Sequence, residues 1–359
     1  MEKSDEITPE NVIIIKNEYY YCTNHLIYKG NKSELYRGNK KTSDSFDLYD
    51  FYGTSLPVCV KMEKPFLKYP ELSKEYSILN YLQKFLEKDS NNQVQCPFVP
   101  IIYNYYPRND TPSYLVTQLL GSSVDTIFKM CHRKFSLMSS LILVKQMVGI
   151  IKKLHEIGII HRNINPTEFL FCKEETSDII LSKQNKKEIN VNPSSQLYLV
   201  DYSEAKFFMK DTSLEYDNNH IEFKDKVKDY SFTNKYFSSI WAELKMEQSR
   251  RDDLYSIFYI LVYLLTGKLP WIGIKAKNKE DKREKIRNMK LCLSNFELCQ
   301  KVNKIISSEV ELFGFYLSGL SFEDEPNYNY LNQLIDEMKK KIFNSKNFDH
   351  FCSKITIKN

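Results

Sequence analysis

Hydrophobic and polar positions divide the chain into a first part rich in short strands and a second part rich in helices. From Tyr19 to Tyr36 they alternate around Tyr28-Lys29-Gly30-Asn31, which predicts a β-hairpin. Pro70-Glu71 opens a segment whose apolar residues recur every three or four positions as far as Phe85, which predicts an amphipathic helix. Further short strands are expected over 57–62, 98–106 and 113–120.

After Gly121 the pattern becomes helical. The apolar run from Ile257 to Leu265 is too short to cross a membrane, because a span needs about 20 apolar residues, and it predicts a buried helix. Gly158 is expected to end a helix, since glycine readily adopts the left-handed backbone found there. Helices are expected over 137–154, 253–266, 282–290, 308–319 and 330–343, and strands over 169–171 and 196–201.

Composition narrows the class of protein. The 359 residues carry 51 Lys and Arg against 46 Asp and Glu, a net charge of +5, and 42% of them are hydrophobic. These values favour a globular protein with local basic patches over an obligate nucleic-acid or membrane binder. The N-terminus lacks a secretion signal and the eight cysteines form no C-x-x-C pair, so we expect reduced thiols and a cytoplasmic or nuclear location.

Ten glycines in 359 residues is a low count against a usual content of about 7%. The shortage matters because glycine lets a backbone approach phosphate closely.

Four segments of the chain carry, in order, the residue types that phosphoryl transfer to a protein hydroxyl requires. The hairpin turn comes first. Lys61 then ends a V-C-V-K strand, and Glu75 follows on the predicted helix, so we predict an ion pair between them. The segment 161–170 reads H-R-N-I-N-P-T-E-F-L, where a catalytic loop is needed, and 200–206 reads V-D-Y-S-E-A-K, where a metal-binding loop is needed.

On these residues the chain resembles the casein kinase 1 family and, less closely, the vaccinia-related kinases. The most specific match is E-Q-S-R-R-D-D-L at 247–254. Further matches are Leu119-Leu120-Gly121, R-K-F-S-L at 133–137, L-P-W-I-G-I-K-A at 269–276 and F-E-D-E-P-N-Y-N-Y-L at 322–331. The resemblance runs from about residue 20 to 343, which is most of the chain.

The resemblance implies an α+β fold of the bilobal protein kinase type. A small β-rich N-lobe with one key helix would occupy 19–118, and a larger, mainly helical C-lobe would occupy 119–343. A polar arm at 1–18, an inserted loop at 173–195 and a tail at 344–359 complete the chain. The arm and the loop are either partner contacts or plain surface.

The chain departs from the family pattern at positions that carry chemistry. Asn163 stands at the catalytic Asp, and an amide cannot accept the proton of a substrate hydroxyl, a loss that typically removes about 10²–10⁴ in rate. Asn165 stands where a lysine would neutralise charge on the transferred group, and Glu168 stands at a magnesium-binding Asn. Tyr28, Ser33 and Ser203 stand where the family has glycine.

By resemblance, ATP and Mg²⁺ binding remains possible, although it is expected to be weak or lost. Asp201 and Glu168 would be the metal ligands, and Asp253 would hold the backbone of the catalytic loop. His161 and Arg162 are expected to be structural. The candidate nucleotide-binding residues are Gly30, Leu35, Cys59, Lys61, Glu75, Gln118, Leu120, Leu170 and Asp201.

Two groups of lysines have alternative interpretations. The family has an anion site for substrates that are already phosphorylated, and its positions match Lys235, Lys279 and Lys282. These lysines either bind a phosphorylated protein or form an ordinary solvated basic face. Lys32 either adds a positive charge near phosphate or is a solvated hairpin tip.

Three functions follow from these residues. The first is a pseudokinase that regulates or binds a protein partner, such as a phosphorylated protein or a related active kinase. The second is a weak or atypical Ser/Thr kinase, and the third is a scaffold that binds no nucleotide. Neither a specific nucleic acid nor a membrane is expected as a partner.

Overall fold

The computed structural model describes residues 20–40, 56–64, 71–88, 98–107, 112–172, 195–209, 220–227 and 236–356. The arm expected at 1–18, nearly all of the inserted loop at 173–195, and Lys235 lie outside these ranges. The chain forms two compact units, Met1–Leu120 and Gly121–Asn359.

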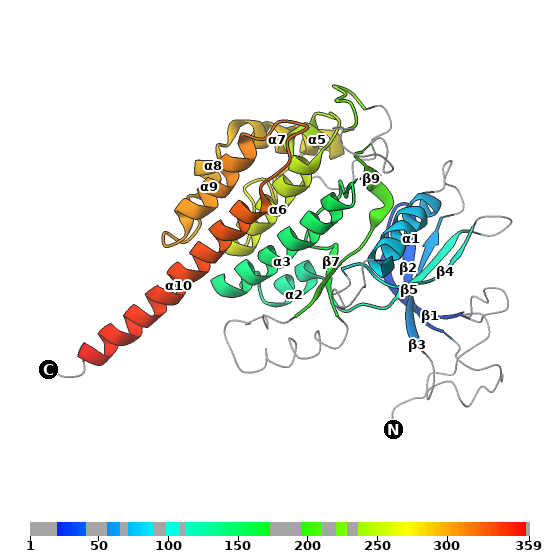
Figure 1. Cartoon of the computed structure of the whole chain (residues 1–359), viewed down its shortest axis with the longest axis horizontal. Helices are drawn as coiled ribbons and strands as arrows, with labels where there is room; N and C mark the ends of the chain where they lie inside the picture. Colours follow the sequence, from blue (N-terminus) through cyan, green and yellow to red (C-terminus); the bar gives the residue numbers. More distant parts are fainter. Residues whose placement is uncertain are drawn as a thin grey trace. The chain divides into compact units, whose positions relative to one another are not determined.

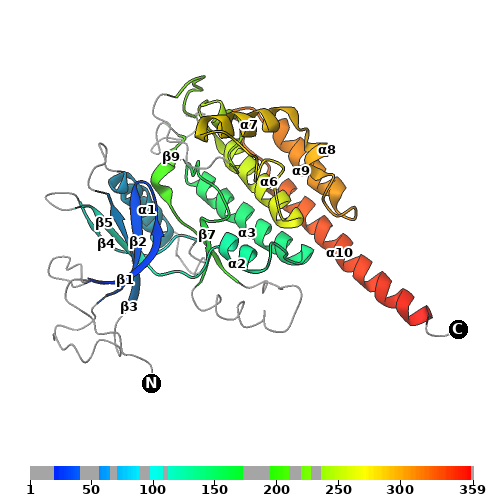
Figure 2. The same cartoon turned by 180° about the vertical axis from the view of Figure 1, so that it is seen from behind.

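The first unit is built on a five-stranded antiparallel sheet with strand order β1-β2-β3-β5-β4, seen from behind in Figure 2. Its strands are β1 (Tyr20–Lys29), β2 (Ser33–Lys40), β3 (Leu56–Glu63), β4 (Ile102–Tyr106) and β5 (Tyr114–Gln118). The predicted hairpin is confirmed, since β1 and β2 pair across a turn at Gly30, whose N–H donates to the Ser33 carbonyl at 2.9 Å. Val58, Val60 and Val116 form a buried cluster in this sheet.

One helix, α1 (Leu72–Lys88), belongs to the first unit, and the buried Glu63 at the end of β3 fixes its start. The Glu63 Oε1 atom accepts the N–H groups of Glu71 at 2.6 Å and Leu72 at 3.2 Å. Ser113 donates its hydroxyl to the other carboxylate oxygen at 3.1 Å. Because the first N–H groups of a helix have no partner within it, this carboxylate both caps α1 and ties it to β3.

The second unit is mainly helical. Its helices are α2 (Val124–Met130), α3 (Leu137–Glu156), α5 (Ile240–Glu243), α6 (Arg250–Thr266), α7 (Lys279–Cys292), α8 (Asn295–Cys299), α9 (Ser307–Ser318) and α10 (Tyr328–Thr356). Every residue of α6 from Leu254 to Leu264 is buried, as its apolar run predicted. Helix α6 packs against α3 and α9, and α10 runs along α3 and α9 (Figure 1).

Two short antiparallel strand pairs hold the loops of the second unit. Strand β6 (Ile159–Ile160) pairs with β9 (Lys206–Phe207), and β7 (Phe169–Phe171) pairs with β8 (Leu197–Leu199). The segments 161–168 and 200–205 lie between these strands in the sequence. Each segment is short and has a paired strand at both ends, which restricts the positions its backbone can take.

The two units have the predicted α+β bilobal protein kinase fold, with differences in the length of elements. The helix expected over 330–343 continues to Thr356, so most of the expected tail at 344–359 is helical instead. The strand expected over 98–106 is shorter and begins at Ile102, after Pro100, which has no N–H to donate. Helices α2, α5 and α8 were not predicted, because helices this short leave little periodicity. Among the described residues, no helix is both long and apolar enough to span a bilayer.

Two helical glycines in the second unit provide a matched test of this packing. A Cβ on Gly314 of α9 would lie 2.7 Å from Phe258 Cζ, whereas a Cβ on Gly149 of α3 would meet nothing within 4 Å. We expect Gly314→Ala to lower the free energy of unfolding by about 1–3 kcal/mol through overpacking. Gly149→Ala should raise it by roughly 0.5–1 kcal/mol, because alanine has the higher helix propensity. Urea denaturation measures both, and effects of the same sign would contradict the packing described.

Candidate active site

The predicted ion pair between Lys61 of β3 and Glu75 of α1 is present, with 2.6 Å between Lys61 Nζ and Glu75 Oε2. The two side chains are only 15% and 4% exposed. An ion pair shielded from water to this extent is screened less by salt than a surface pair. Because the Glu63 carboxylate joins the end of β3 to the start of α1, Lys61 on β3 and Glu75 on α1 are held at a fixed separation.

Lys32, in the hairpin turn, has a partner that the sequence did not indicate. Its Nζ atom lies 2.6 Å from Glu71 Oε1, and its carbonyl accepts the N–H of Lys64 at 2.9 Å. The turn is thereby tied to the start of α1 within the same unit. Lys32 is 30% exposed and paired with Glu71, and both interpretations of its charge stay predictions.

The other candidate nucleotide-binding residues are distributed over both units. Leu35 on β2 pairs in register with Lys61 on β3, and burial raises the pKa of the Cys59 thiol on β3 to about 11. Gln118 ends β5 and its N–H donates to the Ile101 carbonyl at 2.8 Å. Gly30 lies in the hairpin turn, Leu120 ends the first unit, and Leu170 lies on β7 of the second unit. Their joint binding of an adenine ring stays a prediction.

In the second unit, Asp253 on α6 holds the backbone that precedes Asn163, as predicted. Its Oδ2 atom accepts the N–H of His161 at 2.7 Å, and Oδ1 accepts the N–H of Arg162 at 2.8 Å. The Nε2 atom of His155 lies 3.1 Å from Oδ2, and its Nδ1 atom lies 2.6 Å from the Tyr328 hydroxyl. This geometry fits a His155 that donates to Asp253 and accepts from Tyr328.

The protonation states of this buried cluster follow from its hydrogen bonds. Burial lowers the pKa of both His155 and His161, because it disfavours the charged imidazolium. Burial acts to raise the pKa of Asp253, but the hydrogen bonds from His155 and the His161 amide outweigh it and hold that pKa below its ordinary value. The pKa shifts therefore favour the neutral form of both histidines and the ionised form of Asp253.

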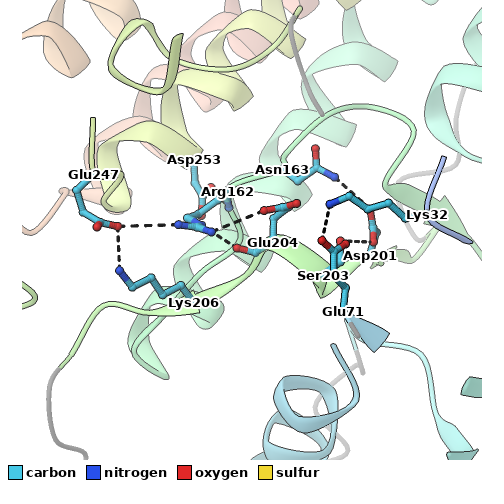
Figure 3. Close-up of polar contacts among 10 residues, drawn as sticks. All are labelled: Lys32, Glu71, Arg162, Asn163, Asp201, Ser203, Glu204, Lys206, Glu247 and Asp253. Atoms are coloured by element: carbon cyan, nitrogen blue, oxygen red, sulfur yellow. Dashed lines mark hydrogen bonds and ion pairs between the residues drawn. The ribbon is translucent and has the colours of Figure 1, made fainter. Parts of the chain in front are cut away.

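Arg162 is also structural, as expected (Figure 3). Its Nε atom donates to the Glu204 carbonyl at 2.7 Å, and its guanidinium lies 3.7 Å from the Glu204 carboxylate and 3.9 Å from that of Glu247. Lys206 pairs with Glu247 at 3.0 Å. These charges fix segment 202–206 against the residues just before α6.

Asp201, the predicted metal ligand, accepts hydrogen bonds on both carboxylate oxygens (Figure 3). The Asn163 amide donates to Oδ2 at 3.1 Å, and the Ser203 hydroxyl donates to Oδ1 at 2.9 Å. Asp201 itself has a φ of +61°, in the left-handed region. Asn163 thus acts here as a hydrogen-bond donor, a role that an ionised aspartate cannot fill.

Glu168, the second predicted metal ligand, is bound in a similar way. Its Oε1 atom accepts the Asn165 amide at 3.2 Å and the Thr167 hydroxyl at 2.9 Å. The Asn165 amide also donates to the Asn163 carbonyl at 3.0 Å. The described residues contain no group of three or more His, Cys, Asp or Glu side chains placed to hold a metal ion.

Sequence reasoning missed the hydrogen-bonding roles of Ser203, Thr167 and Glu63. Ser203 was interpreted only as a lost glycine, although its hydroxyl binds Asp201 two residues away. The two side chains lie only two positions apart, so this bond was within local reach in the sequence. The cap that Glu63 provides joins residues from different elements and had no local signal.

The candidate anion site is described only in part, because Lys235 lies outside the described residues. Lys279 is the first residue of α7, and Lys282 follows one turn later with its Nζ atom 5.6 Å from the centre of the Tyr236 ring. Within the described ranges, neither lysine forms an ion pair, whereas Lys285 pairs with Asp281 at 3.0 Å. Glu280 and Asp281 lie on the same turn of α7, so the anion site stays a prediction.

Comparison with known proteins finds relatives that match most of the chain. It is 33% identical over 287 residues to a probable casein kinase I homolog of Encephalitozoon cuniculi, covering 79% of this chain and 81% of that relative. It is 30% identical over 281 residues to casein kinase I homolog 2 of Schizosaccharomyces pombe, covering 78% of this chain and 56% of the relative. The same yeast's casein kinase I homolog 1 is 30% identical over 305 residues, with 83% and 60% covered. No family model matches the chain.

The Asp253 cluster leads to a test of stability. Asp253→Asn removes the charge from a side chain that is 2% exposed and accepts three hydrogen bonds. We expect it to lower the free energy of unfolding by about 1–3 kcal/mol, because the new amide N–H group would face buried N–H donors and leave at least one of them without an acceptor.

The matched control is Asp336→Asn, because Asp336 is 42% exposed and pairs with Lys145 on the surface. Its effect should stay below about 1 kcal/mol. Thermal and denaturant unfolding of both variants give the comparison. Similar losses of stability at the two positions would refute the anchoring role of Asp253.

Proposed function

The chain belongs to the casein kinase 1 family, and from this premise we propose that it is a catalytically impaired member that regulates or binds other proteins. The observation that carries this proposal is the hydrogen bond from the Asn163 amide to Asp201 Oδ2, at 3.1 Å. At the position of the family's catalytic base, this chain therefore has a neutral hydrogen-bond donor. Such a group has no capacity to take a proton from a substrate hydroxyl.

The residue at position 165 also supports impairment. Asn165, in place of a lysine, carries no charge to stabilise the transferring phosphoryl group, and its amide donates to Asn163 and Glu168 within the loop. The loss of one base typically costs about 10²–10⁴ in rate. Rate losses from residues that act together in one catalytic site cannot simply be multiplied. We therefore propose only that the rate of phosphate transfer is very low.

The Lys61–Glu75 ion pair favours retained ATP binding and, as a second candidate, a weak Ser/Thr kinase. In protein kinases this pair positions the α- and β-phosphates. Here it is intact at 2.6 Å and well shielded from water. The proposal of ATP binding includes nucleotide contacts from Gly30, Leu35, Cys59, Gln118, Leu120 and Leu170. The third possibility, a scaffold that binds no nucleotide, is favoured by no particular contact.

The proposed partner is a phosphorylated protein, for example a related active kinase. Lys279 and Lys282, together with Lys235, are the residues proposed to hold its phosphate. The two positive charges of Lys279 and Lys282 support this role, on a first turn of α7 that also carries Glu280 and Asp281. Recognition without modification is a function that needs the fold but no catalytic base.

Phosphate transfer is the first test. The purified chain, incubated with Mg²⁺, radiolabelled ATP and an acidic peptide primed with phosphoserine, should transfer no label above the level of Lys61→Ala. The reason is that Asn163 supplies neither a base nor a charge. Transfer by the wild-type chain that Lys61→Ala abolishes would contradict the proposal.

The double variant Asn163→Asp with Asn165→Lys separates the two candidate functions in the same assay. A measurable wild-type rate that this variant raises by about 10²-fold or more would favour the weak kinase. A rate at background in the wild type agrees with the pseudokinase whatever the variant does.

Phosphopeptide binding is the second test. The chain should bind a fluorescent acidic phosphopeptide more tightly than its unphosphorylated counterpart, and Lys279→Glu with Lys282→Glu should remove the difference. The control is Lys301→Glu with Lys304→Glu, which makes the same charge change at two exposed lysines between α8 and α9. Equal loss in both double variants would indicate a general effect of charge and sink the proposed site.

A further inference from the structure

The two residues that the family pattern assigns to magnesium already accept hydrogen bonds from other residues of the chain. Both oxygens of Asp201 accept hydrogen bonds, at 3.1 and 2.9 Å, and Glu168 Oε1 accepts two, at 3.2 and 2.9 Å. Magnesium needs near-ideal octahedral geometry with oxygen ligands at about 2.0–2.1 Å. A carboxylate has about four lone-pair sites, so these hydrogen bonds do not fill either residue, but their donors compete with the ion at both of them.

The donors at Asp201 come from the substituted positions. Asn163 stands where the family has an aspartate, and Ser203 stands where it has a glycine. An ionised aspartate cannot donate a hydrogen bond and glycine has no side chain, so the family pattern offers neither donor. Two independent changes therefore converge on one carboxylate, one at each oxygen.

The loop around Glu168 repeats the arrangement. Asn165 stands at the family's lysine, and its amide donates to Glu168 as well as to the Asn163 carbonyl. The Asn165 side-chain oxygen in turn accepts the N–H of Thr167 at 2.9 Å. Asn163 and Asn165 are 5% and 9% exposed, and their bonds to Asp201 and Glu168 are partly buried, whereas the bond from the Thr167 hydroxyl is exposed. A hydrogen bond to a charged acceptor is among the stronger ones in proteins.

We propose that these donors take the place of magnesium at Asp201 and Glu168, so that ATP binds to this chain without a divalent cation. The inference rests on the nucleotide binding put forward above and specifies that this binding does not depend on magnesium. Cellular magnesium would not control occupancy of the site.

A fluorescent ATP analogue, titrated in excess EDTA and in excess MgCl₂, tests the inference directly. The two dissociation constants should agree within about threefold, well under the tenfold that corresponds to 1.4 kcal/mol. A loss of affinity of about tenfold or more in EDTA would overturn the inference and leave the proposed pseudokinase untouched. Absence of binding in both buffers would overturn it together with the nucleotide-binding part of the proposed function. Label transfer, measured separately, is the result that would overturn impairment.

A variant that removes both donors tests the physical cause. Asn163→Asp with Ser203→Gly should make nucleotide affinity depend on magnesium by about tenfold or more. Asn329→Asp, the same charge change at an exposed residue of α10, should leave the wild-type behaviour unaltered. An absence of magnesium dependence in the double variant would contradict the assigned role of the donors.

Magnesium alone provides a second measurement on the same proteins. Added MgCl₂ should leave the melting temperature of the wild type unchanged, because a cation that does not bind the folded state does not stabilise it. It should raise that of the double variant. A magnesium-induced rise in the wild type that Asp201→Asn abolishes would count against the proposal. Should the double variant fail to fold, the wild-type titrations and melts still decide.

Discussion

The second unit depends on one buried carboxylate, that of Asp253. It accepts the N–H groups of His161 and Arg162 and contacts His155, which in turn contacts Tyr328. One side chain on α6 thereby connects the loop before Asn163 with α3 and α10. A buried charge is costly unless it is fully hydrogen-bonded, so the loop backbone can leave this position only at a high cost in free energy. The hydrogen bonds of Asp253 therefore fix the position of the backbone that leads into residues 163–168.

On that backbone the substituted residues form a connected set rather than a series of separate losses. Asn163 and Ser203 bind Asp201, and Asn165 binds Glu168. Each carboxylate that would otherwise need a cation is supplied with donors from nearby residues. A carboxylate without such partners would pay for its lost hydration, so these bonds allow the loop to keep its fold whatever its activity. The proposed loss of phosphate transfer and the proposed independence from magnesium have the same physical origin.

Membership of the casein kinase 1 family and an altered site are compatible, because fold and chemistry depend on different residues. The fold rests on buried helices, on Asp253 and on the ion pairs of Arg162, Glu204 and Glu247. The altered positions lie on a short loop whose ends are held by β6 and β7. Substitution there changes which groups donate and accept hydrogen bonds without exposing apolar surface. A site can therefore diverge on a family fold that is retained.

The sequence by itself determined most helices, because helical periods mark elements that bury one face. Its kinase motifs indicated the Lys61–Glu75 pair, and its resemblance to the casein kinase 1 family implied the α+β kinase fold and the anchoring role of Asp253. Local pattern did not show that Lys32 pairs with Glu71, that Glu63 caps α1, or that α10 continues to Thr356. Nor did it show that Asn163 and Ser203 both bind Asp201. Only the tertiary structure decided these points, because the partner of a polar side chain depends on which distant residues folding brings within about 3 Å of it.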